Sequence, residues 1–166
     1  MKLREVTEGD RLFISILFQT AFGEPGPFRT LEALRADGHL PLELVALDAA
    51  TDRIVGHISF ASLIAPEGWW TLLPIAVVRD RQQSGIETEI LRYGLDRARQ
   101  ARAQAIVVAG GGHLARFGFS AKAAEKLSLP GSRTALMLFP IAAGTAGMRA
   151  TLILPDALST LRTAAE

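Results

Sequence analysis

The chain has 166 residues, of which 49% are hydrophobic and 21% charged, with a net charge of +1 and no cysteine. This length and balance predict one folded domain with its own core and exclude a disordered chain. The small net charge gives no reason to expect nucleic acid or an anionic membrane as a partner, and the lack of cysteine excludes disulfides, thiol catalysis and thiolate metal sites. We expect a cytoplasmic protein, because the lack of cysteine fits a reducing compartment and no apolar run has the length of a membrane-spanning helix. We expect no metal site, because His, Asp and Glu show no ligand spacing.

The first part of the chain predicts a strand followed by two short helices. Residues 2–7 alternate like an edge strand. The next segment carries apolar side chains at helical spacing: Leu12, Phe13, Ile16, Leu17 and Ala21. Glycines and prolines at 23–27 then break the chain. We expect Thr30 to cap a second helix, which ends at Gly38.

A hairpin and a strand–loop–helix unit form the middle of the chain. Residues 42–47 and 54–63 have the pattern of two hairpin strands. Residues 72–78 form an apolar run typical of a buried strand, and polar residues follow up to Gly85. Apolar residues then recur at helical spacing: Ile86, Ile90, Leu91 and Leu95. Such a unit can hold an anionic group, because the N–H groups and the dipole of the first helical turn point into the loop.

The last part of the chain predicts two strands separated by a glycine turn and a short helix. The strands fall at 105–109 and 135–139, and the helix at 113–117. We assign residues 1–140 to one domain and 141–166 to a C-terminal strand and helix extension packed on it. We expect the extension to cover an edge of the sheet, and a homodimer contact is the alternative.

Three motifs resemble those of the GNAT superfamily of N-acetyltransferases, most closely its YhbS-like branch. The central stretch PIAVVRDRQQSGIETEIL is similar to the family's strand ending in L-A-V followed by Q/R-x-x-G-x-G/A. Residues 54–58, with the sequence IVGHI, resemble a hairpin strand of the family. Residues 115–119, with the sequence ARFGF, resemble its late Y-x-R-F-G-F segment. The resemblance covers residues 1–140.

The resemblance implies a mixed α/β (α+β) fold with a central, twisted, mostly antiparallel sheet flanked by helices. It also implies an enzyme that moves an acetyl group from acetyl-CoA to a primary amine of a small molecule or a protein. Catalysis would rest on positioning and on polarisation of the thioester carbonyl by backbone N–H groups near Val77. The residues that match the family's acetyl-CoA site are Ile75, Ala76, Val77, Gln82, Gln83, Ser84, Gly85, Ile86, Glu87, Thr88 and Arg116.

Glu87 departs from the family pattern, which has glycine or alanine at this position. A carboxylate roughly 5 Å from a pyrophosphate charge would cost about 1–3 kcal/mol of binding free energy. The alternative is structural, because Ser84-x-x-Glu87 is a capping-box pattern in which the Glu87 carboxylate accepts a hydrogen bond from the Ser84 amide. We favour the capping box. Our hypothesis is that cofactor binding is weakened or lost.

The late motif departs from the family pattern as well. Leu114 stands where many members carry a tyrosine that protonates the leaving thiolate, and leucine has no proton to donate. His113 is the candidate acid, although we favour an exposed residue that opens the short helix. Glu67, near the expected entrance of the acceptor, is the candidate base acting through water. Arg116 would face either a phosphate of the cofactor or the solvent.

Two functions are compatible with these residues. The first is an active N-acetyltransferase, which the intact Gln82-x-x-Gly85 pattern favours. The second is a degenerate member that keeps the fold, binds coenzyme A weakly or not at all, and serves as a binding or assembly module. Glu87 and Leu114 favour the second function.

Overall fold

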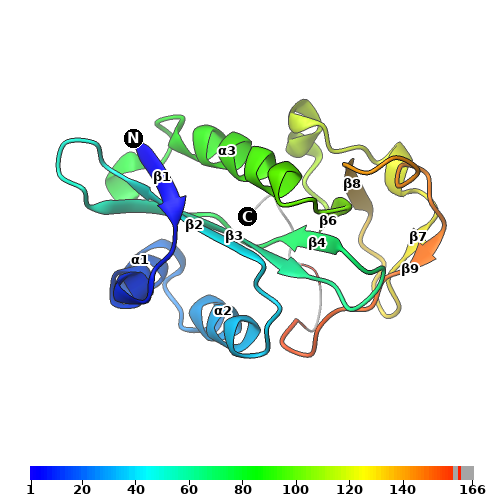
Figure 1. Cartoon of the computed structure of the whole chain (residues 1–166), viewed down its shortest axis with the longest axis horizontal. Helices are drawn as coiled ribbons and strands as arrows, with labels where there is room; N and C mark the ends of the chain where they lie inside the picture. Colours follow the sequence, from blue (N-terminus) through cyan, green and yellow to red (C-terminus); the bar gives the residue numbers. More distant parts are fainter. Residues whose placement is uncertain (159–160, 162–166) are drawn as a thin grey trace.

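A central sheet separates two helical layers in the computed structural model shown in Figure 1. The structure describes residues 1–158 and 161. One helix, α3 (Ile86–Gln100), covers one face of the sheet. The helices α1 (Arg11–Phe22) and α2 (Gly26–Ala36) lie on the other face. This is the predicted mixed α/β architecture.

The sheet is antiparallel except at one junction. Its strands follow the order β1-β2-β3-β4-β6-β8, and β5 also pairs with β3. Only β4 and β6 run parallel, because α3 carries the chain back across the sheet between them. The bounds are β1 Lys2–Glu5, β2 Leu42–Leu47, β3 Ile54–Ser62, β4 Trp69–Leu72, β5 Ala76–Val77, β6 Ala105–Ala109 and β8 Leu136–Pro140.

The remaining elements are short. Four are short 3-10 helices: η1 Glu8–Asp10, η2 Arg79–Arg81, η3 Gly112–Phe117 and η4 Lys122–Ala124. β7 (Leu127–Ser128) pairs in parallel with β9 (Ala150–Thr151). Of the helix predicted in the C-terminal extension, the described part is a turn in which the Leu158 N–H donates to the Pro155 carbonyl (2.9 Å). The rest of that helix lies outside the described residues.

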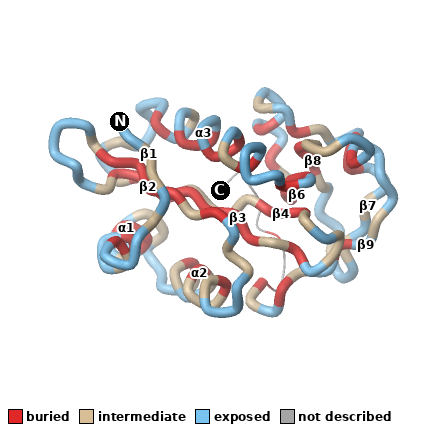
Figure 2. Tube along the Cα trace, viewed as in Figure 1, coloured by how far each residue is buried: buried red, intermediate tan, exposed pale blue. Residues whose placement is uncertain are grey.

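The core lies on both faces of the sheet, and Figure 2 shows buried residues along the central strands and on the inner sides of the helices. α1 turns a different face inward from the one predicted. Its buried residues are Ile14, Leu17 and Phe18. By contrast, three residues of the predicted stripe are exposed: Leu12, Phe13 and Ile16. The inward face is set by Phe18, whose ring packs edge-on against Phe28 (5.9 Å between ring centroids) and His57 (5.0 Å).

α2 begins earlier than predicted. The helix starts at Gly26, so Thr30 lies inside it and is not its cap. Pro27 explains the early start, because its fixed φ suits the first helical turn and its missing N–H is not needed there. The helix ends before Gly38, as expected.

Candidate active site

The sheet opens where β4 gives way to β5. β4 pairs with β6 as far as Thr71, which lies opposite Val107. Pro74 then interrupts the strand, because proline has no N–H to donate to a ladder. β5 resumes beside β3, and among the described strands it has no partner on the side toward β6. The strand predicted at 72–78 is therefore split, and its second half has a free edge.

Val77 directs its backbone polar groups toward this free edge. The Val78 N–H donates to the Val55 carbonyl (2.9 Å). Alternate residues of an antiparallel pair bond to the partner strand, so Val77, opposite Gly56, points its N–H and C=O away from β3. Gln82 Nε2 donates to that C=O (3.0 Å). The Val77 N–H is left to polarise a carbonyl oxygen placed beside it.

The loop before α3 delivers free amides to the same place. Gln83 and Gly85 have positive φ values of 66° and 87°, and glycine adopts such values without strain. The first helical hydrogen bond runs from the Glu89 N–H to the Gly85 carbonyl (3.2 Å). The amides of residues 86–88 precede it and have no acceptor within the helix. Together with the helix dipole, they favour an anion in front of α3.

The predicted capping box is wrong. The cap residue of α3 is Gly85, without a side-chain hydrogen bond, and Ser84 Oγ donates instead to the Arg81 carbonyl. The turn at Gly85 begins the helix one residue later than a Ser84 cap requires. Glu87 is exposed on the first turn, and within the described part of the chain its carboxylate forms no hydrogen bond or ion pair. Its negative charge therefore lies on the first turn of α3 without an ion-pair partner among the described residues.

Two arginines hold this loop against the rest of the protein. Arg81 forms an ion pair with Asp48 on the turn between β2 and β3. The hydrogen bond from Arg81, with two from backbone amides of the turn, lowers the pKa of Asp48 to about 2. Arg79 donates to the Thr20 carbonyl near the end of α1 (3.4 Å). The loop is thus fixed at both sides, while the amides of residues 86–88 that follow it remain free.

η3 brings the late motif to the same side of the sheet. Leu114 is 3% exposed and belongs to the same apolar cluster as Val77 and Ile86. His113 is exposed beside it. Position 114 therefore fills the core and supplies no proton donor, whereas His113 remains open to solvent.

Arg116 lies next to α3, where it shares an aromatic contact with Arg92. Its guanidinium carbon is 4.8 Å from the centroid of the Phe117 ring, and that of Arg92 on α3 is 5.0 Å from the same ring. The shared ring holds two cations close together.

Glu67 is not brought to the free edge of β5. It is exposed in the turn between β3 and β4, where the neighbouring Gly68 carbonyl accepts a hydrogen bond from the Gln104 N–H (2.9 Å). This turn lies at the start of β4 and β6, whereas Val77 lies beyond the other end of β4. The structure therefore separates the predicted base from the residues that would hold the thioester.

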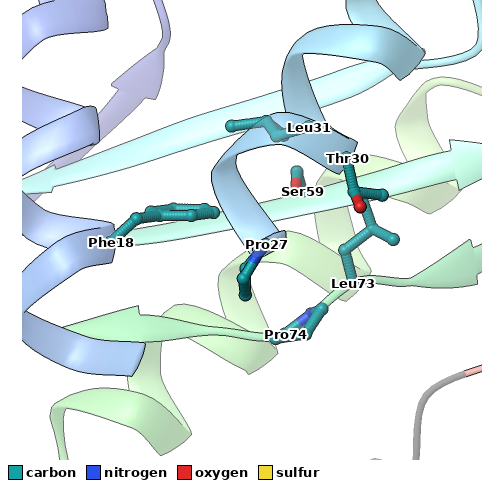
Figure 3. A pocket seen from close by; sticks show the side chains of 7 residues that line it. All are labelled: Phe18, Pro27, Thr30, Leu31, Ser59, Leu73 and Pro74. Carbon is teal, nitrogen blue, oxygen red and sulfur yellow. The ribbon is translucent and has the colours of Figure 1, made fainter. Parts of the chain in front are cut away.

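A small cavity lies on the opposite face of the sheet from α3 (Figure 3). It has a volume of about 20 Å³ and is lined by Phe18, Pro27, Thr30, Leu31, Ser59, Leu73 and Pro74. Leu73 and Pro74 join β4 to β5, so the cavity adjoins the point at which the sheet opens.

His57, to which the sequence analysis gave no role, lies in a buried polar network on this face. Its Nε2 is 2.8 Å from Oε2 of Glu43, and Arg35 donates to both oxygens of that carboxylate (2.7 Å each). Burial raises the pKa of Glu43, but the hydrogen bonds and charges of His57 and Arg35 outweigh it and lower the pKa overall. A glutamate inside an otherwise apolar hairpin strand was the available signal for such a network.

The described residues contain no group of three or more His, Asp or Glu side chains that could hold a metal ion. No helix in the same part of the chain is long and apolar enough to cross a membrane.

Comparison with known proteins identifies the family. The model of the acetyltransferase (GNAT) family matches residues 12–119. The uncharacterized N-acetyltransferase YhbS of Escherichia coli K12 is 29% identical over 136 residues, which cover 78% of this chain and 80% of the relative. The crystal structure of E. coli YhbS in complex with CoA superposes with a TM-score of 0.83 at 25% identity, covering 96% of this chain and 93% of that one. A GNAT acetyltransferase from Brucella melitensis in complex with acetyl-CoA gives a TM-score of 0.76 at 27% identity, covering 94% and 96%. The chain belongs to the GNAT family of acetyltransferases and has its fold.

Proposed function

We propose that the protein is an N-acetyltransferase that binds acetyl-CoA along the free edge of β5 and in front of α3, and passes the acetyl group to a primary amine. The observation that carries the proposal is the unpaired edge of β5 at Val77, followed within one loop by the free amides of residues 86–88 at the start of α3. Two structurally similar relatives hold CoA or acetyl-CoA, which supports the same ligand here.

Different groups of the protein contact different parts of acetyl-CoA. The amides of residues 86–88 hold the pyrophosphate, and Gly85 lets the backbone approach it closely. The Val77 N–H donates to the thioester oxygen and stabilises the negative charge that develops there. Gln82 fixes the loop to β5 through the Val77 carbonyl. Arg92 and Arg116 add positive charge beside α3 for the remaining phosphate of the cofactor.

The acceptor enters from the other face. α3 covers one side of the opening in the sheet, and α1 and α2 frame the other side. Reactants brought from opposite faces meet at the opening between β5 and β6, which orients the amine toward the thioester carbon. No covalent bond to the enzyme is needed, and no nucleophilic side chain is used.

The second candidate is a binding module that has lost catalysis. It is favoured by the unpaired carboxylate of Glu87 before α3 and by the buried position of Leu114. Glu87 opposes binding of the anionic cofactor, and Leu114 leaves protonation of the thiolate to the solvent.

Calorimetric titration with acetyl-CoA separates the two candidates. Micromolar binding, followed by amine-dependent release of CoA, supports the enzyme. Because the chain has no cysteine, a thiol-reactive dye reports released CoA without background from the protein. Absence of binding up to millimolar acetyl-CoA by the folded protein would support the module.

A further inference from the structure

α1 carries apolar side chains on the face that points away from the sheet. Leu12, Phe13 and Ile16 are 67%, 59% and 55% exposed, and Figure 2 shows the outer side of the helix in pale blue. The opposite face of α1 packs on the sheet and is also apolar. A helix with one partner normally has a single apolar face, whereas a helix that is apolar on all sides is buried on all sides. The three exposed residues, here called the α1 patch, therefore indicate a second partner.

The size of the α1 patch matches the apolar part of a protein interface. Its three side chains together expose roughly 350 Å², as much as the largest apolar patch on a typical monomer. An interface of standard size buries about 800 Å² on each partner, of which about 450 Å² is apolar. The patch would supply most of this apolar area, and the polar residues around it would supply the remainder.

The α1 patch is complementary to itself. A two-fold axis perpendicular to α1 places two copies of the helix antiparallel, with the same surface on both sides of the contact. The register that sets Leu12 of one copy against Ile16 of the other places Phe13 of both copies near the axis and buries the whole patch. Helices that cross at about 20° stay in contact along their length. The contact then extends beyond the patch by one turn at each end.

Opposite charges meet at these two ends. Glu8 is exposed one turn before Leu12, and Thr20 follows Ile16 by one turn. Arg79 is exposed beside Thr20, whose carbonyl accepts a hydrogen bond from the guanidinium (3.4 Å). Within the described part of the chain, neither Glu8 nor Arg79 forms an ion pair. The antiparallel register brings Glu8 of each copy next to Arg79 of the other, twice by symmetry.

We propose that the α1 patch is the centre of a homodimer interface, in which two α1 helices lie antiparallel about a two-fold axis and Glu8 pairs with Arg79 at each end. A second copy of the chain is the partner, because it supplies the apolar surface and the opposite charges in the matching order. The inference does not depend on the proposed acetyl transfer, and it is tested without acetyl-CoA.

Analytical ultracentrifugation of the full chain tests the dimer. The wild type should sediment as a dimer with a micromolar or tighter dissociation constant. Ile16→Lys places a cation on each side of the axis without weakening the helix, and it should raise the dissociation constant at least about a hundredfold. The matched control is Ile153→Lys, because Ile153 is 51% exposed but lies next to the turn before β4, and this variant should match the wild type. Near-UV circular dichroism of the buried Trp69 and Trp70 shows that each variant is folded.

Exchange of the end charges separates the interface from a local structural role. Glu8→Arg and Arg79→Glu should each raise the dissociation constant at least about fivefold, because each replaces two exposed ion pairs by repulsion. The double variant restores opposite charges and should return the constant to near the wild-type value. A change at Glu8 cannot repair the lost hydrogen bond between Arg79 and Thr20, so this rescue reports the interface alone. The effect of each single variant should shrink as salt is added.

The register is tested with single cysteines, which the chain otherwise lacks. Positions 8 and 20 lie about 18 Å apart along one helix, so neither Glu8→Cys nor Thr20→Cys can reach its own equivalent across the axis. An oxidised mixture of the two variants should give a disulfide-linked dimer on a non-reducing gel, whereas each variant alone should stay unlinked.

Three results would overturn the inference. A wild type that is monomeric at high micromolar concentration would show that the patch has another occupant, such as a different protein or a membrane. An Ile16→Lys variant that remains dimeric would place the interface elsewhere on the chain. A cysteine mixture that links no better than either variant alone would exclude the antiparallel register.

Discussion

Replacing Glu87 with glutamine should strengthen acetyl-CoA binding. The carboxylate is exposed on the first turn of α3, next to the free amides of residues 86–88, and has no ion-pair partner among the described residues. At roughly 5 Å from a pyrophosphate charge, the repulsion is about 0.8 kcal/mol in water and about 3 kcal/mol at an effective dielectric constant of 20. The dissociation constant should therefore fall by about fourfold at least and by about two hundredfold at most.

Glu89→Gln is the matched control for this substitution. Glu89 is also an exposed acid of the first turn, but it follows the free amides, and its own N–H already bonds to the Gly85 carbonyl. Calorimetric titration should show tighter binding for Glu87→Gln than for Glu89→Gln. The difference should shrink as salt is added, because exposed charges are screened over about 10 Å at 0.1 M salt.

Either of two results would refute this reasoning. An unchanged affinity of Glu87→Gln at low salt would mean that the carboxylate turns away from the phosphates. A weaker affinity would mean that Glu87 supports the loop, and that removing its charge costs more than the repulsion it relieves.

Three other substitutions test the loop, the core and the N-terminal region. Gly85→Ala should weaken acetyl-CoA binding in calorimetry while costing only about 1–2 kcal/mol of stability, because its φ of 87° is unfavourable for alanine. Gly94→Ala should lower the free energy of unfolding in urea by about 1–3 kcal/mol, since an added Cβ would lie 2.7 Å from Ile58 Cδ1, and an unchanged value would mean that this side chain simply rotates away. The hydrogen bond from Arg4 is the main cause that lowers the pKa of Asp10 to about 2, so this pair stabilises the fold above pH 4 and is lost as the pH falls through 2. Asp10→Asn should therefore cost about 1 kcal/mol at pH 6, a value discounted because Arg4 is 42% exposed, and almost nothing near pH 1.5; equal costs at both pH values would contradict the assignment.

The helix of the strand–loop–helix unit could be predicted from its sequence, whereas the strand before it is split at Pro74. α3 has a polar face and an apolar face, and the predicted residues Ile86, Ile90, Leu91 and Leu95 are all buried. The small residues Gly94 and Ala98 are buried beside them. α1 is apolar over most of its first half, and periodicity alone could not choose its inner face. The inner face is determined by the packing of Phe18 against Phe28 on α2 and His57 on β3.

The loop before α3 and the cavity on the opposite face of the sheet also differ in how far the sequence predicts them. The loop before α3 depends on local backbone conformation, which Gly85 and the start of the helix determine. The capping-box pattern failed there because Gly85, with its positive φ, is the cap residue in place of Ser84. By contrast, the cavity on the opposite face of the sheet gathers Phe18, Ser59 and Leu73 from three distant parts of the chain. Their meeting depends on how α1 and α2 dock on the sheet, and no motif marks it.

The proton that must leave the amine is a larger obstacle than the one that reaches the thiolate. An alkylamine with a pKa near that of lysine, about 10.4, is neutral in fewer than about one molecule in a thousand at pH 7, a cost of about 4–5 kcal/mol before attack. A thiol with a pKa near 8.5 leaves as an anion that water protonates readily at the same pH. Loss of a tyrosine at position 114 therefore removes the less demanding of the two proton transfers. A base near the amine is therefore worth more to this reaction than a proton donor near the sulfur.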